Sequence, residues 1–156
     1  AFDFYKKKYV KIVTVSDIGK AREGVTQIVK FHGDLDYISS IVLTESSYFD
    51  RLSFESPLDI KFRADTLHKT ILFVGYGLND INVRYMLYRL ARIWSSDAKI
   101  GGARPQSYIF LSRPNPIREK VLENQGVKAI VSKSDNEAEG LTDLLKRIAD
   151  GVAAKT

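Results

Sequence analysis

His32 and Gly33 stand directly after the run Thr26–Phe31, which has the composition of a β-strand. At the C-terminal end of such a strand, the imidazole would lie where open α/β sheets keep their ligand crevice. Histidine exchanges protons near neutral pH, and a glycine beside it lets a substrate approach the backbone closely. His32 is therefore a candidate general base, although a lone histidine is also compatible with a structural or merely exposed role. His68 has only this second interpretation.

A glycine turn forms the second candidate site. The apolar run Thr70–Gly75 leads into the sequence GYGLNDIN and then into a segment of helical period. Gly75 and Gly77 permit a tight turn and close backbone approach, while Asn79 or Asp80 can cap the following helix. Free N–H groups at the start of that helix would favour a phosphate group. The turn thus predicts a phosphate site, although the same arrangement also connects many α/β elements without a ligand.

Polar residues follow two further apolar runs, Ser107–Leu111 and Val127–Ser132. These polar residues are Ser112, Asn115, Ser134 and Asp135. If both runs are parallel strands, these residues share one sheet edge with His32 and Gly75, within reach of a ribose or an adenine ring. Helix capping is the alternative interpretation, and a residue at this edge can cap a helix and still face the crevice.

The chain alternates short β-branched runs with longer segments of helical period, which is typical of βαβ units. The expected strands are Lys11–Val15, Thr26–Phe31, Thr70–Gly75, Ser107–Leu111 and Val127–Ser132. The last three are nearly continuous apolar runs, as expected for strands buried on both faces. The sequence therefore predicts an α/β fold with a parallel sheet flanked by helices on both faces.

Helix boundaries are marked by caps. Asn115 followed by Pro116 fits an N-cap with proline at the first helical position, and Gly126 fits a left-handed C-cap. Thr44 and Ser56 are predicted to cap two short helices in the less regular part of the chain. Two further helices carry one apolar stripe each, and the stripe of the last helix is predicted to be buried. The stripes consist of Val83, Leu87, Leu90 and Trp94, and of Leu141, Leu144, Leu145 and Ile148.

Composition limits the class of protein. The 156 residues are 44% hydrophobic, which is enough for one domain with its own core. The sequence has no cysteine, which excludes disulfides and cysteine-ligated zinc, and no apolar run reaches the roughly 18 residues of a membrane span. We therefore expect a cytoplasmic location and no membrane partner. The net charge of +5 comes from scattered basic residues, so we expect no nucleic-acid binding.

Four segments in this order resemble the successive motifs of prokaryotic sirtuin-like domains. They are FHGDLD, VLTESSYFDRL, ILFVGYGLNDINVRYML and IFLS, and the resemblance extends from the region of Lys11 to the final helix. Their combination carries the resemblance, because each motif alone would be unremarkable. It implies a Rossmann-like fold that holds NAD, no metal, and a catalytic role for His32 near the nicotinamide ribose.

The resemblance also implies two groups of cofactor contacts. The first is the family's glycine turn with its following polar pair, matched here by Gly75, Gly77, Leu78, Asn79, Asp80 and Asn82. The second is the adenosine side, where Ser112 replaces the asparagine that sirtuins often use for the ribose, and where the adenine-side loop is matched by Ser134 and Asp135. Gly33 is a further expected contact, because a glycine beside His32 lets the ligand approach the backbone. The arginines of the chain are compatible with either NAD or NADP.

The chain departs from zinc-containing sirtuin deacylases after the histidine. Those enzymes carry a cysteine-bound zinc module there, whereas this chain has SSIVLTESSYFDRL. Zinc-free prokaryotic relatives are similar to NAD hydrolases, which are often the toxic effector part of anti-phage defence proteins. Hydrolysis of NAD to nicotinamide and ADP-ribose is therefore the leading activity for the parent protein. An NAD-dependent protein deacylase and an inactive nucleotide-sensing or oligomerisation module are the alternatives.

Two motifs of sirtuin-like domains have no counterpart here: an opening Gly-Ala-Gly turn and an asparagine motif beside the histidine. The opening AFDFYKKKYV is expected to be the helix that follows the asparagine motif. We therefore expect residues 1–156 to be the later part of a single sirtuin-like domain, completed by an upstream part of the same domain. The chain alone should be inactive, and its exposed sheet edge could support a homo-oligomer.

Overall fold

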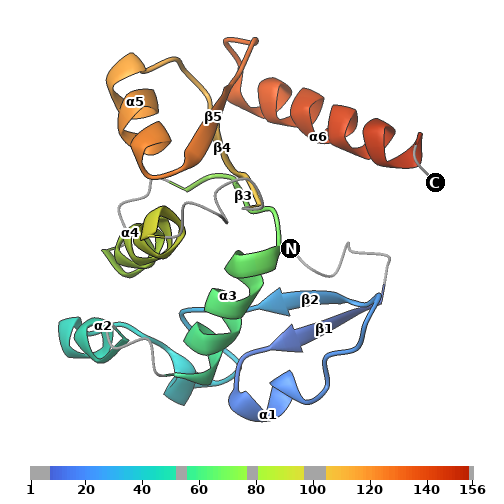
Figure 1. Cartoon of the computed structure of the whole chain (residues 1–156). Helices are drawn as coiled ribbons and strands as arrows, with labels where there is room; N and C mark the ends of the chain where they lie inside the picture. Colours follow the sequence, from blue (N-terminus) through green and yellow to red (C-terminus); the bar gives the residue numbers. More distant parts are fainter. Residues whose placement is uncertain (1–7, 52–55, 77–80, 97–104, 155–156) are drawn as a thin grey trace. The chain divides into compact units, whose positions relative to one another are not determined.

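The computed structural model describes residues 8–51, 56–76, 81–96 and 105–154. The chain divides into two compact units, Ala1–Ala64 (unit 1) and Asp65–Thr156 (unit 2). Figure 1 shows their helices and strands in sequence colours. Both units combine parallel strands with helices, so the protein has the α/β, Rossmann-like architecture that its alternating segments predict.

Unit 1 contains a two-stranded parallel sheet. Its strands are β1 (Tyr9–Ile12) and β2 (Thr26–Val29), which are joined through the short helix α1 (Val15–Ile18). Lys11 lies opposite Ile28 and Ile12 lies opposite Val29 in the ladder. Ile12 and Val13 are the buried apolar side chains among the described residues of this unit. The unit therefore has a small apolar core beside its sheet.

Strand β1 ends earlier than the predicted Lys11–Val15, because the Asp17 carboxylate captures the next backbone amides. Its Oδ2 atom accepts hydrogen bonds from the N–H groups of Val13 and Thr14 at 3.1 and 3.0 Å. These two amides are consequently turned toward α1 instead of continuing the ladder. Val15 begins that helix instead of ending the strand.

The predicted helix in the opening segment is wrong where the structure describes it. Tyr9 and Val10 lie in β1, and residues 1–7 lie outside the described residues. Aromatic and β-branched side chains favour a pleated, half-buried surface, and here the neighbouring β2 supplies the partner strand. Tertiary pairing therefore decides the conformation of this segment.

Unit 1 continues with the 3₁₀ turn η2 (Ile38–Ser40), α2 (Glu45–Arg51) and α3 (Pro57–His68), the last of which crosses the division between the units. Helices α2 and α3 begin at the predicted caps Thr44 and Ser56. Thr44 Oγ1 accepts a hydrogen bond from Ser47 N at 3.2 Å, and Ser56 Oγ accepts one from Asp59 N at 3.2 Å. Each hydroxyl satisfies one of the free N–H groups in the first helical turn.

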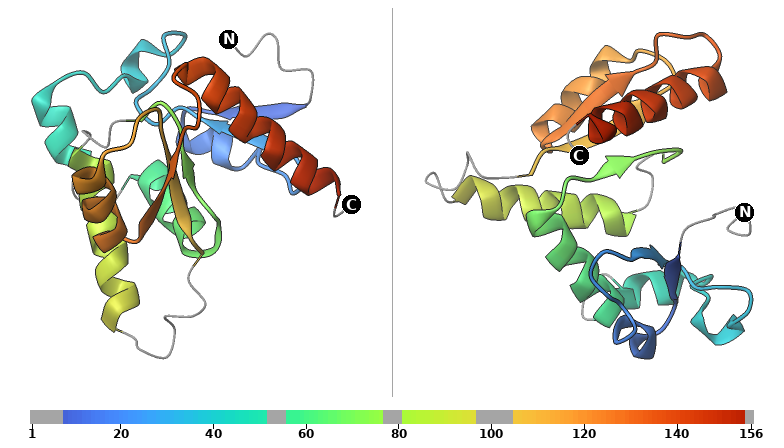
Figure 2. Two further views of the ribbon diagram at one scale, coloured as in Figure 1. Left: turned by 90° about the horizontal axis from the view of Figure 1, so that it is seen from above. Right: turned by 90° about the vertical axis from the view of Figure 1, so that its right-hand side faces the viewer.

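Unit 2 contains a three-stranded parallel sheet in the order β3-β4-β5. Its elements are β3 (Leu72–Phe73), α4 (Ile81–Ser96), β4 (Ser107–Leu111), α5 (Pro116–Asn124), β5 (Val127–Val131) and α6 (Glu137–Ala153). Helices α4 and α5 lie on one side of this sheet and α6 lies on the other (Figures 1 and 2). The sheet is therefore covered on both faces, as the apolar sequence of its strands predicts.

The apolar core of unit 2 is built on the central strand β4. Ile109, Phe110 and Leu111 of this strand are buried, and Val127 of β5 is fully buried beside them. The covering helices contribute the buried leucines Leu87, Leu122 and Leu144. Leu87 confirms part of the stripe predicted for α4, whereas the side chains of Val83, Leu90 and Trp94 lie outside the described residues.

Helix α6 is only partly buried. Leu144 is buried, but 47% of Leu145 and 43% of Ile148 are exposed, so the prediction that both are buried is wrong. A helix of 17 residues is about 25 Å long, whereas a strand of five residues spans roughly 17 Å. The last turns of α6 therefore extend beyond the sheet. No helix in the described parts of the chain combines the length and apolar character of a membrane span.

Candidate functional site

His32 lies beyond the C-terminal end of β2, as the sequence predicts. Strand β2 ends at Val29, and the His32 side chain is exposed three residues later. Its ring lies edge-on to the Phe31 ring, with 6.5 Å between the centroids. Phe31 in turn contacts Phe62 of α3 at 5.0 Å. The exposed histidine thus directly follows a residue, Phe31, that is anchored by aromatic packing.

Gly33 has a structural requirement that the sequence does not predict. Its φ of +89° lies in the left-handed region, and its N–H donates to the Lys30 carbonyl at 3.2 Å. A Cβ at this position would overlap the backbone of Ser40 and Ile41. The glycine is therefore required by the protein's own loop, which returns close to it.

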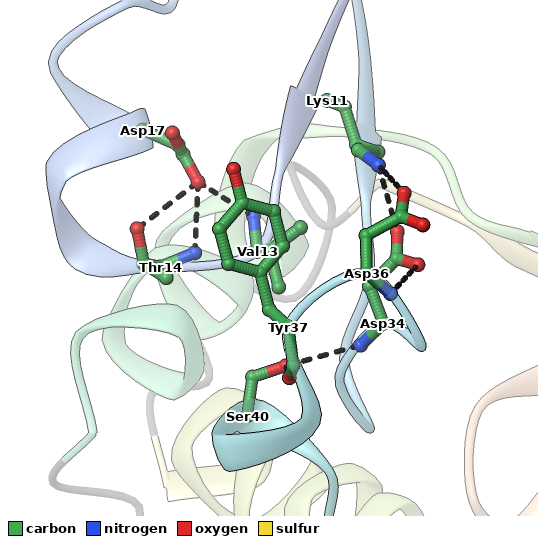
Figure 3. Close-up of polar contacts among 8 residues, drawn as sticks. All are labelled: Lys11, Val13, Thr14, Asp17, Asp34, Asp36, Tyr37 and Ser40. Atoms are coloured by element: carbon green, nitrogen blue, oxygen red, sulfur yellow. Dashed lines mark hydrogen bonds and ion pairs between the residues drawn. The ribbon is translucent and has the colours of Figure 1, made fainter.

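Residues 32–42 form a compact loop, which we call the His32 loop. Val42 N donates to the His32 carbonyl at 3.2 Å and closes the base of the loop. Within it, Asp34 N donates to Ser40 Oγ at 3.1 Å, and Ser40 Oγ donates to the Tyr37 carbonyl at 2.6 Å (Figure 3). These bonds fix the backbone that carries the histidine.

Lys11 of β1 contacts two acidic residues of the His32 loop. Its Nζ atom lies 3.0 Å from Asp34 Oδ2 and 2.9 Å from Asp36 Oδ2 (Figure 3). The hydrogen bonds to Asp36 and Asp34 raise the pKa of Lys11 well above its ordinary value. The hydrogen bond from Lys11, with a backbone hydrogen bond from Asp36, lowers the pKa of the Asp34 carboxyl. Lys11 and Asp34 are consequently both charged at neutral pH.

Some of the other predicted residues meet at a pocket of about 500 Å³ in unit 2, at the ends of β3 and β4. Predicted residues in its wall are Gly75, Ser112 and Asn115, and the wall also includes Tyr76, Arg113, Arg118 and Glu137. A pocket of this size suits part of a small-molecule ligand. The prediction that Ser112 and Asn115 share one sheet edge with Gly75 is therefore confirmed.

Gly75 leaves open space beside the pocket. Its φ is +63°, and a Cβ built on it would meet no atom within 4 Å. Gly33 differs, because a Cβ there would overlap the protein's own backbone. A ligand in the pocket can therefore approach the backbone closely at this turn.

Asn115 fulfils both interpretations that the sequence left open. Its Oδ1 atom accepts a hydrogen bond from Arg118 N at 2.9 Å, so it caps α5, and it also lines the pocket. Ser134 takes part in the start of α6, because its Oγ accepts from Asn136 N at 3.1 Å and donates to Glu139 Oε2 at 3.1 Å. Ser134 and the exposed Asp135 are not among the residues that line the pocket.

Several predicted contacts cannot be placed. Gly77, Leu78, Asn79 and Asp80 lie outside the described residues, as does the side chain of Asn82, whose backbone belongs to α4. Among the residues that are described, no group of three or more histidine and acidic side chains is arranged to hold a metal ion.

Sequence reasoning missed Lys11 and the charged residues of the pocket wall. Arg113 directly follows Ser112, and Arg118 and Glu137 lie in the first turns of α5 and α6. Ligands of open α/β sheets bind beyond the carboxyl ends of the strands, and this rule could have identified Arg113, Arg118 and Glu137 as well. Lys11 has no comparable signal, because its partners are far away in the sequence.

Comparisons with known proteins place the chain in a family. The sequence profile of the family described as "SIR2-like domain" matches residues 1–130. The match covers most of the chain, so the chain belongs to the SIR2-like domain family. The match also confirms the resemblance that the motifs indicate.

Curated relatives carry the name "NAD(+) hydrolase ThsA". The protein of Bacillus cereus (strain MSX-D12) is 28% identical over 141 residues, which are 83% of this chain and 29% of that protein. The protein of Enterococcus faecium is 32% identical over 84 residues, which are 53% of this chain and 16% of that protein. The chain thus spans less than a third of the length of these relatives.

Proposed function

We propose that the protein to which this SIR2-like chain belongs hydrolyses NAD to nicotinamide and ADP-ribose. The similarity to proteins named NAD(+) hydrolases, over 83% of the chain, supports this activity. Because the chain spans only 29% of that relative, the activity is proposed for the whole protein.

The placement of His32 is the observation that carries the proposal. An exposed imidazole stands just beyond a parallel strand, on a loop whose backbone is fixed by hydrogen bonds. In the proposed reaction, His32 takes a proton from a water molecule or from a ribose hydroxyl. The water oxygen bonds to C1′ of the nicotinamide ribose as the glycosidic bond breaks, and nicotinamide leaves with the bonding electron pair. The proton is then released to solvent.

The pocket of unit 2 is proposed to bind part of the dinucleotide. Gly75 offers close approach to the backbone, and the Ser112 hydroxyl can hydrogen-bond a ribose. The guanidinium groups of Arg113 and Arg118 suit an anionic ligand, because arginine binds phosphate groups well. Glu137 in the same wall suits a ribose hydroxyl as a hydrogen-bond acceptor.

The remaining features of the proposal rest on the family resemblance. We propose a setting in anti-phage defence, in the cytoplasm of a prokaryote, with a homo-oligomer as one assembly. Deacylation is the alternative activity, but the sequence has no cysteine for the zinc module of zinc-containing deacylases. The reaction proposed here needs no metal.

The test is nicotinamide release from NAD by the full-length protein in the absence of any acylated peptide. His32→Ala is expected to lower the rate by roughly 100-fold or more, as loss of a general base does. His68→Ala is the matched control, because His68 is the second of the two histidines of the chain and lies at the end of α3. Equal rates in the His32→Ala variant and the unmodified protein would overturn the role of His32. A requirement for an acylated peptide would favour the deacylase.

A further inference from the structure

Lys11 is fixed by the sheet, not by the loop that it contacts. It lies inside β1, and its backbone is held by pairing with β2, where it stands opposite Ile28. Its ammonium group reaches Asp34 and Asp36, which follow His32 by two and four residues. A rigid strand is thereby connected to the first turn of the His32 loop.

The bonds within the loop do not supply this connection. Asp36 N donates to Asp34 Oδ1 at 3.3 Å, and Tyr37 N donates to the Asp34 carbonyl at 2.9 Å. Both join one loop residue to another, so they shape the loop without fixing its place beside β1. Lys11 also lies 6.0 Å from the centre of the Tyr37 ring. The lysine thus ties this compact loop to the neighbouring strand through two ion pairs.

The arrangement differs from an ordinary surface ion pair, which contributes little. One cation here binds two carboxylates, and 12% of the Asp34 side chain is exposed, compared with 72% of Asp36. Asp34 Oδ1 also accepts a hydrogen bond from the Asp36 amide, and the Asp34 amide donates one to Ser40 Oγ. Removal of the Lys11 charge would leave a poorly solvated carboxylate at the centre of the loop.

We propose that Lys11 is a positioning residue for His32, acting through Asp34 and Asp36 of the His32 loop. This inference rests on the proposed function, in which His32 must be held in place against the reacting ribose. The carboxylates fix the turn that begins at Gly33, and this turn fixes the backbone of the histidine. Small displacements of a catalytic group lower the rate strongly, so the positioning should appear in kcat.

The test compares Lys11→Met, which keeps the apolar stem, with Lys11→Arg, which keeps the charge, in the full-length protein. The matched control is Lys120→Met, which removes an exposed lysine paired with Glu123 at 2.8 Å on α5. The measurements are kcat and KM for nicotinamide release from NAD, and deuterium exchange of the amides in residues 32–42. Asp34→Asn serves as a second variant that keeps the side-chain shape if Lys11→Met does not fold.

We expect Lys11→Met to lower kcat by roughly 10- to 100-fold while KM changes by less than about threefold. Exchange in residues 32–42 should accelerate, most clearly at the Val42 amide that closes the loop. Lys11→Arg should restore most of kcat, Asp34→Asn should resemble Lys11→Met, and Lys120→Met should leave both measurements unchanged.

The proposal is overturned if a folded Lys11→Met or Asp34→Asn variant keeps its kcat, even when exchange in the loop accelerates. It is also overturned if exchange in residues 32–42 stays unchanged, or if Lys11→Arg does not restore activity. Failure of the proposed function gives a different result, because the unmodified protein would then release no nicotinamide. The exchange measurement still decides in that case whether Lys11 holds the loop.

Discussion

The His32 loop of unit 1 and the pocket of unit 2 both follow parallel strands, but different forces hold them. The loop is held by polar contacts, namely the ion pairs of Lys11 and the hydrogen bonds of Asp34 and Ser40. The pocket lies at the end of β4, and Ile109, Phe110 and Leu111 of this strand are buried under helices. One site is thus organised by charge and the other by apolar packing.

This difference matches the two tasks that we propose. A base must be exposed to meet water and substrate, so it cannot be fixed by burial and depends on its neighbouring polar groups. A binding pocket can stand directly on a rigid core, because its wall only has to present shape and a few polar atoms.

Gly33→Ala should have the largest effect, because the glycine backbone lies in the left-handed region and a Cβ would overlap Ser40 and Ile41. We expect a loss of about 2 to 4 kcal/mol in the unfolding free energy of unit 1, measured by hydrogen exchange in β1 and β2. Gly24→Ala is the control, because Gly24 has a φ of +74° but open space around it, and it should cost about 1 kcal/mol. Equal losses would show that the close approach at Gly33 does not matter.

Gly140→Ala tests the packing in unit 2. A Cβ on this residue of α6 would overlap the Ser132 side chain, whose Oγ accepts the Ser134 amide at 3.1 Å. We expect a loss of about 1 to 3 kcal/mol in the stability of unit 2, measured by hydrogen exchange in β4 and β5. Gly151→Ala in the same helix has open space and should stabilise it by up to about 1 kcal/mol. A neutral Gly140→Ala would contradict the close packing of α6 on the sheet.

Asn115→Ala removes the cap of α5 beside the pocket. The loss should be about 1 kcal/mol, because the Arg118 amide loses its acceptor at 2.9 Å. Faster exchange confined to the first turn of α5 is the expected observation. Asn124→Ala, at the other end of the same helix, is the control and should leave that turn unchanged. If both variants behave alike, the cap does not organise this part of the pocket wall.

Acid should loosen the His32 loop before it affects the core of unit 2. The pKa of Asp34 is lowered first by its hydrogen bond from Lys11, then by the Asp36 amide, with Lys30 as a further nearby charge. A carboxyl with a lowered pKa contributes stability fully above its unfolded value of about 4, and this contribution is lost as the pH falls through the folded pKa. The raised pKa of Lys11 leaves it charged throughout this range.

The measurement is amide exchange against pH, corrected for the intrinsic rate. Exchange in residues 32–42 should rise below about pH 4 in the unmodified protein, relative to exchange in β4. Asp34→Asn should show fast loop exchange already at neutral pH and little further change in acid. Asp36→Asn should have a smaller effect, because Asp36 is more exposed. A pH-independent loop would contradict its organisation by charge.

Local signals in the sequence predicted many elements. Thr44, Ser56 and Asn115 were identified as caps because capping depends on residues within one helical turn. The apolar runs of β4 and β5 were identified because burial on both faces leaves a continuous pattern. Asp17 also lies three residues after Thr14, a spacing that could have revealed the early end of β1.

Contacts between distant residues could not be predicted. Lys11 lies 25 residues from Asp36, and their pairing depends on the place of the loop beside β1. The contact of Gly33 with Ser40 and Ile41 likewise depends on the full path of the loop. Both features shape the surroundings of the candidate base. The sequence therefore indicates His32 as the base but not the contacts that hold its loop in place.

The most direct test of this division is one kinetic comparison in the full-length protein, with His32→Ala in unit 1 and Ser112→Phe in unit 2. Ser112 lines the pocket, so a phenylalanine should fill it, and Ser112→Ala is the control. We predict that His32→Ala abolishes nicotinamide release but still binds NAD, whereas Ser112→Phe mainly raises the KM for NAD. Loss of NAD binding in His32→Ala, or an unchanged KM in Ser112→Phe, would contradict the assignment of chemistry to the His32 loop and of binding to the pocket.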